Sequence, residues 1–179
     1  TRVIFHFTDD SVLFFNDLRK FGYLHLISEE EKQQVESRFG PDPTRGEFSL
    51  DVFRGQIQNR KRLIKALLLD QKLIAGIGNI YADEACFVSG VMPDRKSNSL
   101  SSDEIEKLHK AIVEILNKAV EMKGTTFRNY TDADGKSGSY SDLLKVYGRD
   151  GENCLRCDGV VLKQKTAGRG THYCENCQK

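Results

Sequence analysis

The alternation of apolar and polar positions separates a strand-rich start from a longer helical region. Apolar runs at residues 2–7 and 11–15, joined by a polar turn, predict a β-hairpin, and the run at residues 22–27 predicts a third strand. Strands this rich in large aromatic residues need a second layer to cover them. We therefore expect residues 1–40 to be the remnant of an N-terminal β-sandwich domain whose preceding strands are missing from this sequence.

Helical periodicity dominates after residues 40–43, where two prolines in four residues break the chain. The longest predicted helix has a capping box formed by Ser101 and Glu104, and Gly124 marks its C-terminal end. We expect a helical domain over residues 41–145, which makes the fold class α+β. The predicted helices cover residues 29–39, 49–57, 60–70, 79–88 and 101–123.

Four of the five cysteines lie near the C-terminus in two C-x₂-C pairs separated by sixteen residues. This spacing is typical of four thiolates that bind one tetrahedral zinc ion. Two β-favouring runs around a Gly-rich turn lie between the pairs and predict a hairpin with Arg169 at its tip. We expect residues 146–179 to form a zinc-finger hairpin with one structural zinc. The predicted ligands are Cys154, Cys157, Cys174 and Cys177.

Two other interpretations of the cysteines stay open on the motif alone. One is a zinc ribbon that only packs; the other is a disulfide-bonded scaffold. The disulfide scaffold is less favoured, because no stretch resembles a signal peptide and Cys86 falls in an apolar helical run without a partner. So short a segment cannot bury enough apolar area to fold alone, whereas zinc supplies roughly 10–16 kcal/mol of apparent binding free energy to such modules. His172 is treated as a strand residue.

Composition bounds the class of protein: 39% hydrophobic and 30% charged residues suit a soluble globular chain. No run approaches about 18 apolar residues, so no membrane span is expected, and unpaired cysteines favour a cytoplasmic location. The formal net charge is only +1, but acidic residues concentrate at 29–31 and 103–106. We therefore expect one basic face. Its predicted members in residues 54–72 are Arg54, Arg60, Lys61, Arg62, Lys65 and Lys72.

Gly76, Gly78 and Asn79 stand at the start of a predicted helix. The free N–H groups and partial positive charge of a helix N-terminus suit a phosphate, and the Asn79 amide can donate to the same oxygen. Glycines at such a turn more often serve backbone geometry alone. The nearby basic residues favour a polymeric anion, because no parallel strand precedes the motif as a mononucleotide fold requires.

Five separated motifs resemble the bacterial formamidopyrimidine-DNA glycosylases and occur in that family's order; endonuclease VIII is a poorer match. The resemblance runs from Arg2 to Lys179 and covers the C-terminal two-thirds of the family's length. It implies a β-sandwich, a helix-two-turn-helix bundle and a zinc hairpin around a cleft that binds double-stranded DNA with a damaged base or an abasic site. The motifs are residues 16–22, 75–84, 135–138, 146–148 and 167–174.

The resemblance also implies roles for single residues. Asn79, beside Gly76 and Gly78, and Arg169 at the hairpin tip match phosphate-binding residues that flank the lesion. Tyr147 and Lys163 match further phosphate contacts. Together these residues would fix both phosphates beside an extruded nucleotide.

A further pair, Arg19 and Phe21, matches the residues that fill the space left by the extruded base. The aperiodic, polar residues 125–142 match the loop that caps the flipped purine. From the residues alone, Phe21 could equally be a core residue beside a turn, and a loop this long is usually functional or disordered.

The family's nucleophile is an N-terminal proline followed by a glutamate acid, whereas this chain begins Thr1-Arg2. We therefore expect part of a bifunctional DNA glycosylase and AP lyase for base excision repair of oxidised purines. No catalytic residue is expected in this chain, which should be inactive alone; Arg169 has a supporting role. The full-length protein is expected to be a monomer. The alternatives are a non-catalytic zinc-dependent DNA-binding module and a zinc ribbon that binds RNA or protein.

Overall fold

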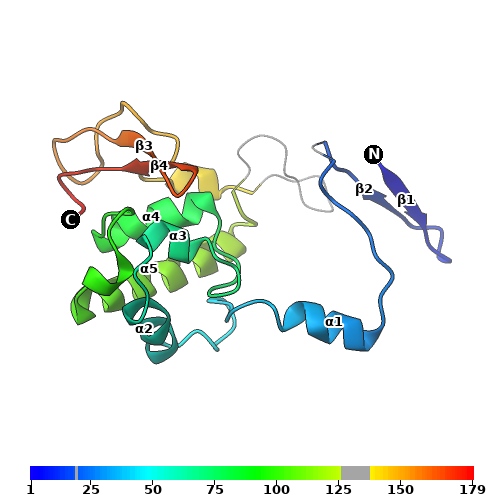
Figure 1. Ribbon diagram of the computed structural model, residues 1–179. Helices are drawn as coiled ribbons and strands as arrows, with labels where there is room; N and C mark the ends of the chain where they lie inside the picture. The colour runs from blue at the N-terminus through cyan, green and yellow to red at the C-terminus, as the bar shows by residue number, and fades with distance from the viewer. Residues whose placement is uncertain (19, 126–137) are drawn as a thin grey trace. The chain divides into compact units, whose positions relative to one another are not determined.

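The computed structural model describes residues 1–18, 20–125 and 138–179, and the chain divides into two units, Thr1–Glu36 and Ser37–Lys179 (Figure 1). In the first unit, β1 (Val3–His6) pairs antiparallel with β2 (Val12–Phe15), with Val3 opposite Phe15. The predicted hairpin is confirmed, and the sandwich around it stays a prediction.

Two expectations for the first unit are wrong. Within residues 20–36 the structure has no strand at 22–27, because a strand needs a hydrogen-bonded neighbour and this run has none in the described part of the unit. Helix α1 (Glu29–Glu36) ends earlier than the predicted residue 39. Its mean apolarity is low, and none of its described residues is buried, so little packing extends it.

The second unit is built on four helices among the described residues. They are α2 (Leu50–Gln58), α3 (Ile64–Leu68), α4 (Asn79–Ser89) and α5 (Ser102–Glu121), with 3₁₀ turns η1 (Ser97–Ser99) and η2 (Tyr140–Leu143). Helix α3 is much shorter than the predicted 60–70. Leu63 instead forms an antiparallel bridge with Lys96, so the chain enters α3 extended, and tertiary pairing overrides helical periodicity there.

Helix α5 begins as predicted. The Ser101 hydroxyl accepts the N–H of Glu104, and the Glu104 carboxylate accepts the N–H of Ser101. After the helix, Gly124 adopts a positive φ of 85° and donates its N–H to Ala119 O. The apolar face of α5 packs on α2 and α4 and completes the core. Its buried residues are Ile105, Leu108, Ala111, Ile112, Ile115, Leu116 and Ala119.

The C-terminal hairpin pairs β3 (Leu162–Thr166) with β4 (Arg169–Tyr173) and lies alongside α4 (Figure 1). Its two turn residues, Ala167 and Gly168, have φ values of 51° and 77°. Two consecutive positive φ values are the type I′ geometry whose twist matches the strands. Arg169 therefore sits directly after the turn, opposite Thr166. Among the described helices, none combines the length and apolarity needed to cross a bilayer.

Candidate functional site

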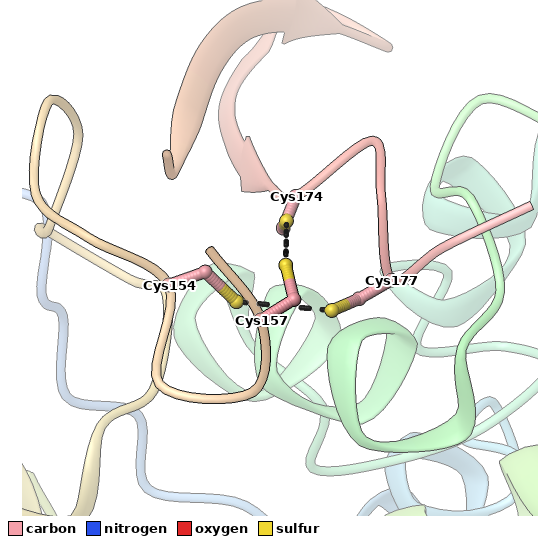
Figure 2. A group of neighbouring side chains, drawn as sticks. All are labelled: Cys154, Cys157, Cys174 and Cys177. Carbon is pink, nitrogen blue, oxygen red and sulfur yellow. Dashed lines mark hydrogen bonds between the residues drawn. The ribbon is translucent and has the colours of Figure 1, made fainter. Parts of the chain in front are cut away.

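The four C-terminal cysteines converge on one point (Figure 2). Their sulfur atoms all lie within 4.8 Å of one another, with Cys154 Sγ 3.8 Å from Cys177 Sγ and Cys157 Sγ 3.6 Å from Cys174 Sγ. A tetrahedron with Zn–S bonds of about 2.3 Å has S–S edges of about 3.8 Å. The geometry therefore fits a single zinc ion, and among the described cysteines no disulfide is formed.

The thiols of the cluster differ in how readily they ionise: hydrogen bonds from the backbone N–H groups of Arg156 and Cys157 outweigh burial and lower the pKa of Cys154 to about 7, whereas two other thiols are shifted the opposite way. Burial raises the pKa of Cys174, and burial with the neighbouring Cys157 and Cys154 thiols raises the pKa of Cys177 to about 12. A divalent ion reverses this, because it binds thiolates and offsets their mutual repulsion. Cys86 lies outside the cluster; it is fully buried, and burial raises the pKa of its thiol, so it behaves as a core residue.

The turn before α4 is shaped by Gln71. Its Oε1 accepts the N–H of Gly76 and its Nε2 donates to Ile77 O, both at 2.9 Å. Gly76 has a φ of 82°, which favours glycine, and Gly78 caps α4. A Cβ built at either glycine meets no described atom within 4 Å. The backbone at the start of α4 is therefore open to a ligand.

The structure brings Asn79 and Arg169 together although 90 residues separate them in the sequence. Asn79 Nδ2 donates to the carbonyl oxygen of Gly170 at 3.0 Å, which ties the first residue of α4 to the residue after Arg169. The Arg169 side chain is exposed, and in residues 1–18, 20–125 and 138–179 it meets no acidic or hydrogen-bonding partner. Within that part of the chain its guanidinium is open to an external anion.

The other two predicted phosphate contacts, Tyr147 and Lys163, both lie next to His172 of β4. The Tyr147 ring meets the His172 ring edge-on, with centroids 4.8 Å apart. Lys163 is paired with His172 across the hairpin, and its ammonium lies 3.3 Å from Asp150, whose pKa it lowers by a hydrogen bond. Both partners of this ion pair are about half exposed, so it is weak and easily exchanged for a phosphate. His172 is a strand residue, as predicted.

Two buried carboxylates on α4 were missed from the sequence. Glu84 is 1% exposed, and its oxygens accept the backbone N–H groups of Lys145, Val146 and Tyr147 at 2.9 to 3.0 Å. Asp83 is fully buried beside it and binds Lys65. The available signal was two adjacent acids inside an otherwise apolar helix, since such residues are rarely buried unless paired.

Lys65 was assigned to the basic face, and this is wrong. Its side chain is fully buried, and its ammonium lies 2.5 Å from Asp83 Oδ1. Arg62 is exposed but bonds Asp70 at 2.7 Å and lowers the pKa of that carboxyl. The basic face is accordingly smaller than the sequence indicates, because helix α3 turns Lys65 inward.

The remaining predicted residues are not all described. Phe21 is 75% exposed in the first unit, where most of the other large apolar residues are exposed too, so both interpretations of Phe21 stay predictions. Arg19 lies outside the described residues, as does most of the predicted capping loop, residues 126–137. The ends of that loop meet in a bridge between Thr125 and Ser139.

A cavity of about 590 Å³ lies beside the start of α4. It is lined by Gly76, Tyr81, Thr125 and the C-terminal end of α5, together with residues of the connection to α2. Tyr81 Oη and Thr125 Oγ1 are hydrogen-bonded at 2.9 Å across one wall. The volume is in the range of small-molecule sites and is ample for a single planar base.

Comparison with known proteins identifies two family models. Residues 39–131 match the formamidopyrimidine-DNA glycosylase H2TH domain, and residues 151–179 match the zinc finger found in FPG and IleRS. These segments contain the α4 turn and the four-cysteine cluster respectively.

Full-length relatives are similar along the whole chain. Formamidopyrimidine-DNA glycosylases of Listeria innocua and Geobacillus kaustophilus are each 45% identical over 181 residues. The match covers 100% of this chain and 66% of either relative, so the chain spans slightly less than two-thirds of their length.

Solved structures give the same result. A Lactococcus lactis FPG variant in complex with Fapy-dG-containing DNA is 40% identical and has a TM-score of 0.87 over 95% of this chain and 63% of that chain. The FPG protein of Thermus thermophilus is 40% identical with a TM-score of 0.87, covering 93% of this chain and 64% of that chain. The L. lactis protein has also been solved with DNA that contains an abasic site.

Proposed function

The chain belongs to the formamidopyrimidine-DNA glycosylase family, and from this premise we propose that it supplies the duplex-binding part of a DNA glycosylase and AP lyase. The reaction is excision of oxidised purines in base excision repair, and the partner is double-stranded DNA with a damaged base or an abasic site. The protein acts in the cytoplasm, as a monomer when full-length.

One observation carries the proposal: the hydrogen bond from Asn79 to Gly170, which holds a helix N-terminus against an arginine with an open guanidinium. Asn79 Nδ2 keeps a second proton for a phosphate oxygen, and Arg169 can bond two oxygens at once. The open backbone at Gly76 and Gly78 adds N–H donors and the positive end of the α4 dipole. These groups suit neighbouring phosphates of one strand.

Tyr147 and Lys163 extend this surface along the hairpin. Both lie around His172, and Lys163 can exchange Asp150 for a phosphate at little cost. The cavity beside Gly76 and Tyr81 is roomy enough for an extruded purine, with residues 125–142 as its cap. Zinc supplies no step in the chemistry; Cys154, Cys157, Cys174 and Cys177 hold it, and it fixes the hairpin.

For the first unit we propose the void-filling role. Arg19 would face the orphaned cytosine, and the exposed ring of Phe21 would wedge into the base stack. Residues 1–40 would belong to an N-terminal β-sandwich, residues 41–145 to the helical domain and residues 146–179 to the zinc hairpin. Because the family's proline and glutamate match no position here, residues 1–179 alone are expected to bind damaged duplex without excising the base.

The test is binding of the zinc-loaded chain to a duplex with an abasic-site analogue, followed by fluorescence anisotropy over a range of salt concentrations. Four phosphate contacts predict that log affinity falls with log salt with a slope of about −4. The matched undamaged duplex should bind more weakly, and Phe21→Ala should reduce that preference more than total affinity. A flat salt dependence would reject the DNA assignment.

Arg169→Ala tests the central residue. It should weaken binding by about 1–3 kcal/mol and leave the zinc content unchanged. Lys107→Ala is the matched control: it also removes one positive charge, but from an exposed residue of α5 that pairs with Asp103. If Arg169→Ala also loses zinc, the arginine is structural.

A further inference from the structure

Lys65 is the most deeply placed charge in the second unit. Its side chain is fully buried in α3, between the buried residues Ile64 and Leu67. The ammonium group donates hydrogen bonds to Gly170 O at 2.7 Å and Thr171 Oγ1 at 2.8 Å, and it forms an ion pair with Asp83 Oδ1 at 2.5 Å. Because its side chain is fully buried among these partners, Lys65 cannot contact DNA, and any role in binding must act through them.

Two partners of Lys65, Gly170 and Thr171, directly follow Arg169 in β4. The Thr171 hydroxyl that accepts from Lys65 donates in turn to the carbonyl oxygen of Arg169 at 3.2 Å. The Gly170 carbonyl oxygen accepts from both Lys65 and Asn79. Lys65 is therefore bonded, directly or through one hydroxyl, to the backbone on the C-terminal side of the Arg169 Cα and to the partner of Asn79.

Asp83 fixes the next residue of the strand. Its Oδ2 accepts the backbone N–H of His172 at 2.9 Å and lies 3.3 Å from the Nδ1 of the same residue. Residues 170–172 are thus all bonded to one buried ion pair that bridges α3 and α4. The hairpin is short and its turn is exposed, so without these bonds the turn end would be held to the helices mainly by the hydrogen bond from Asn79 to Gly170 O.

Stability does not explain this pair. Desolvation of two buried charges offsets most of their attraction, and apolar pairs of similar size are often as stable or more so. Burial lowers the pKa of Lys65 and raises that of Asp83, although each opposes the change in the other. What an apolar pair could not supply is a set of directed hydrogen bonds to β4.

We propose that Lys65 is a positioning residue: with Asp83 it fixes β4 at residues 170–172, and thereby the direction in which Arg169 presents its guanidinium beside Asn79. The inference rests on the proposed function, since it concerns how a phosphate-binding residue is held. It predicts that the contribution of Arg169 to DNA binding depends on a lysine that never touches DNA.

The test is a double-mutant cycle in the zinc-loaded chain. Lys65→Met combined with Asp83→Asn removes both charges at similar volume and keeps an acceptor oxygen for the His172 N–H, so no unpaired charge stays buried. In the parent chain Arg169→Ala should weaken binding to abasic-site duplex by roughly 5- to 150-fold. In the Lys65→Met, Asp83→Asn chain the same change should cost no more than about twofold, the limit of additivity.

A matched control separates positioning from general stability. Leu68→Val, in the same helix, is a buried change that makes no bond to β4, and in that background the full factor for Arg169→Ala should persist. Retention of the full factor in the Lys65→Met, Asp83→Asn chain overturns the inference. If Arg169→Ala leaves the affinity of the parent chain for DNA unchanged, the proposed role of Arg169 is overturned, and this inference with it.

Amide hydrogen exchange gives a readout that does not depend on DNA. In the Lys65→Met, Asp83→Asn chain, exchange at residues 170–172 should become faster while exchange along α5 stays as in the parent chain. Equal acceleration in α5 would make Lys65 a residue of general stability and overturn positioning. Unchanged exchange at residues 170–172 would do the same, even where the DNA-binding function holds.

Discussion

The hairpin β3–β4 is attached to α4 at both ends, but by different chemistry. Near the cysteines, Arg156 donates to Phe87 O and Val88 O at the C-terminal end of α4, and Gln178 donates to Val91 O. Near the turn, residues 170–172 bond to side chains from α3 and the N-terminal part of α4. The cysteine end is organised by a metal within a short segment, and the turn end by long-range contacts.

The difference between the two ends of the hairpin separates the residues that make it fold from those that direct it for the proposed function. Zinc binding closes a local structure whose four ligands all come from residues 154–177, so it determines whether the hairpin exists. The bonds from Lys65, Asn79 and Asp83 span 89 to 106 residues of sequence and determine where the turn points. Changes at the first end should abolish the hairpin, whereas changes at the second should misdirect a hairpin that still forms.

The largest effect should follow removal of zinc. Chelation, or Cys174→Ser, removes up to roughly 10–16 kcal/mol of apparent binding free energy from the C-terminal module. The residues from Val146 onward should unfold, seen as loss of amide protection in β3 and β4. Circular dichroism should still report the helices of residues 49–123. Cys86→Ala should leave the zinc stoichiometry at one, since Cys86 lies outside the cluster.

Simultaneous melting of the helices on chelation would contradict this separation. It would mean that the Arg156 and Gln178 contacts couple the metal module to α4 strongly enough to form a single cooperative unit. The two ends of the hairpin would then differ in their contacts but not in their effect on folding.

The same difference explains what the sequence predicted. The cysteine spacing, the α5 capping box and the hairpin turn are all local patterns, in which the residues that interact lie a few positions apart. Each was found from the sequence. For Asn79, spacing alone left a turn and a phosphate site open, and the resemblance in residues 75–84 favoured the phosphate role, which stays a prediction.

The errors share the opposite cause. Lys65 resembled its basic neighbours Arg60 and Arg62, and only the packing of α3 against α4 shows that it is buried. The start of α3 was misplaced because Leu63 pairs with Lys96. The strand expected at residues 22–27 relied on β-propensity, which reflects packing that the described part of the first unit does not provide. No local pattern encodes these long-range contacts.

A second prediction concerns Glu84, which anchors the approach to the cysteine end. Glu84→Ala leaves the N–H groups of residues 145–147, that of Val146 fully buried and the other two partly buried, without an acceptor and should lower the free energy of unfolding by about 3 kcal/mol or more. Urea denaturation measures this, and zinc stoichiometry should not change. Glu84→Gln keeps one acceptor oxygen and should cost less.

The control for Glu84 is Glu114→Ala, because Glu114 is exposed on α5 and should change stability by no more than about 0.5 kcal/mol. Equal effects of Glu84→Ala and Glu84→Gln would show that charge, rather than the number of acceptors, holds residues 145–147. Glu84 would then act through its charge, as the Lys65–Asp83 ion pair does at the turn end, and the two ends of the hairpin would differ less in their chemistry.

The smallest expected effect is a pH dependence at the cysteine end, where Arg95 donates to Lys179 O at 2.9 Å and also bonds Glu104. The hydrogen bond from Arg95 lowers the pKa of Glu104 below its ordinary 4.5. A carboxyl with a lowered folded-state pKa contributes stability that is fully present above pH 4.5 and is lost as pH falls through the folded value. Glu104→Gln should therefore cost about 1 kcal/mol at pH 7, including the weakened capping box, and progressively less below pH 4.5.

Urea denaturation of both chains at each pH measures this difference, and zinc loss at low pH cancels because both chains carry the same four cysteines. Glu106→Gln removes the same charge from an exposed position of α5 and should show no comparable trend. A Glu104→Gln cost that stays constant from pH 7 to well below pH 4.5 would mean that the neutral side chain caps α5 and orients Arg95 as well as the carboxylate does. The stability of the cysteine end would then depend on the charge of the zinc ion and its thiolates, and not on the charge of Glu104.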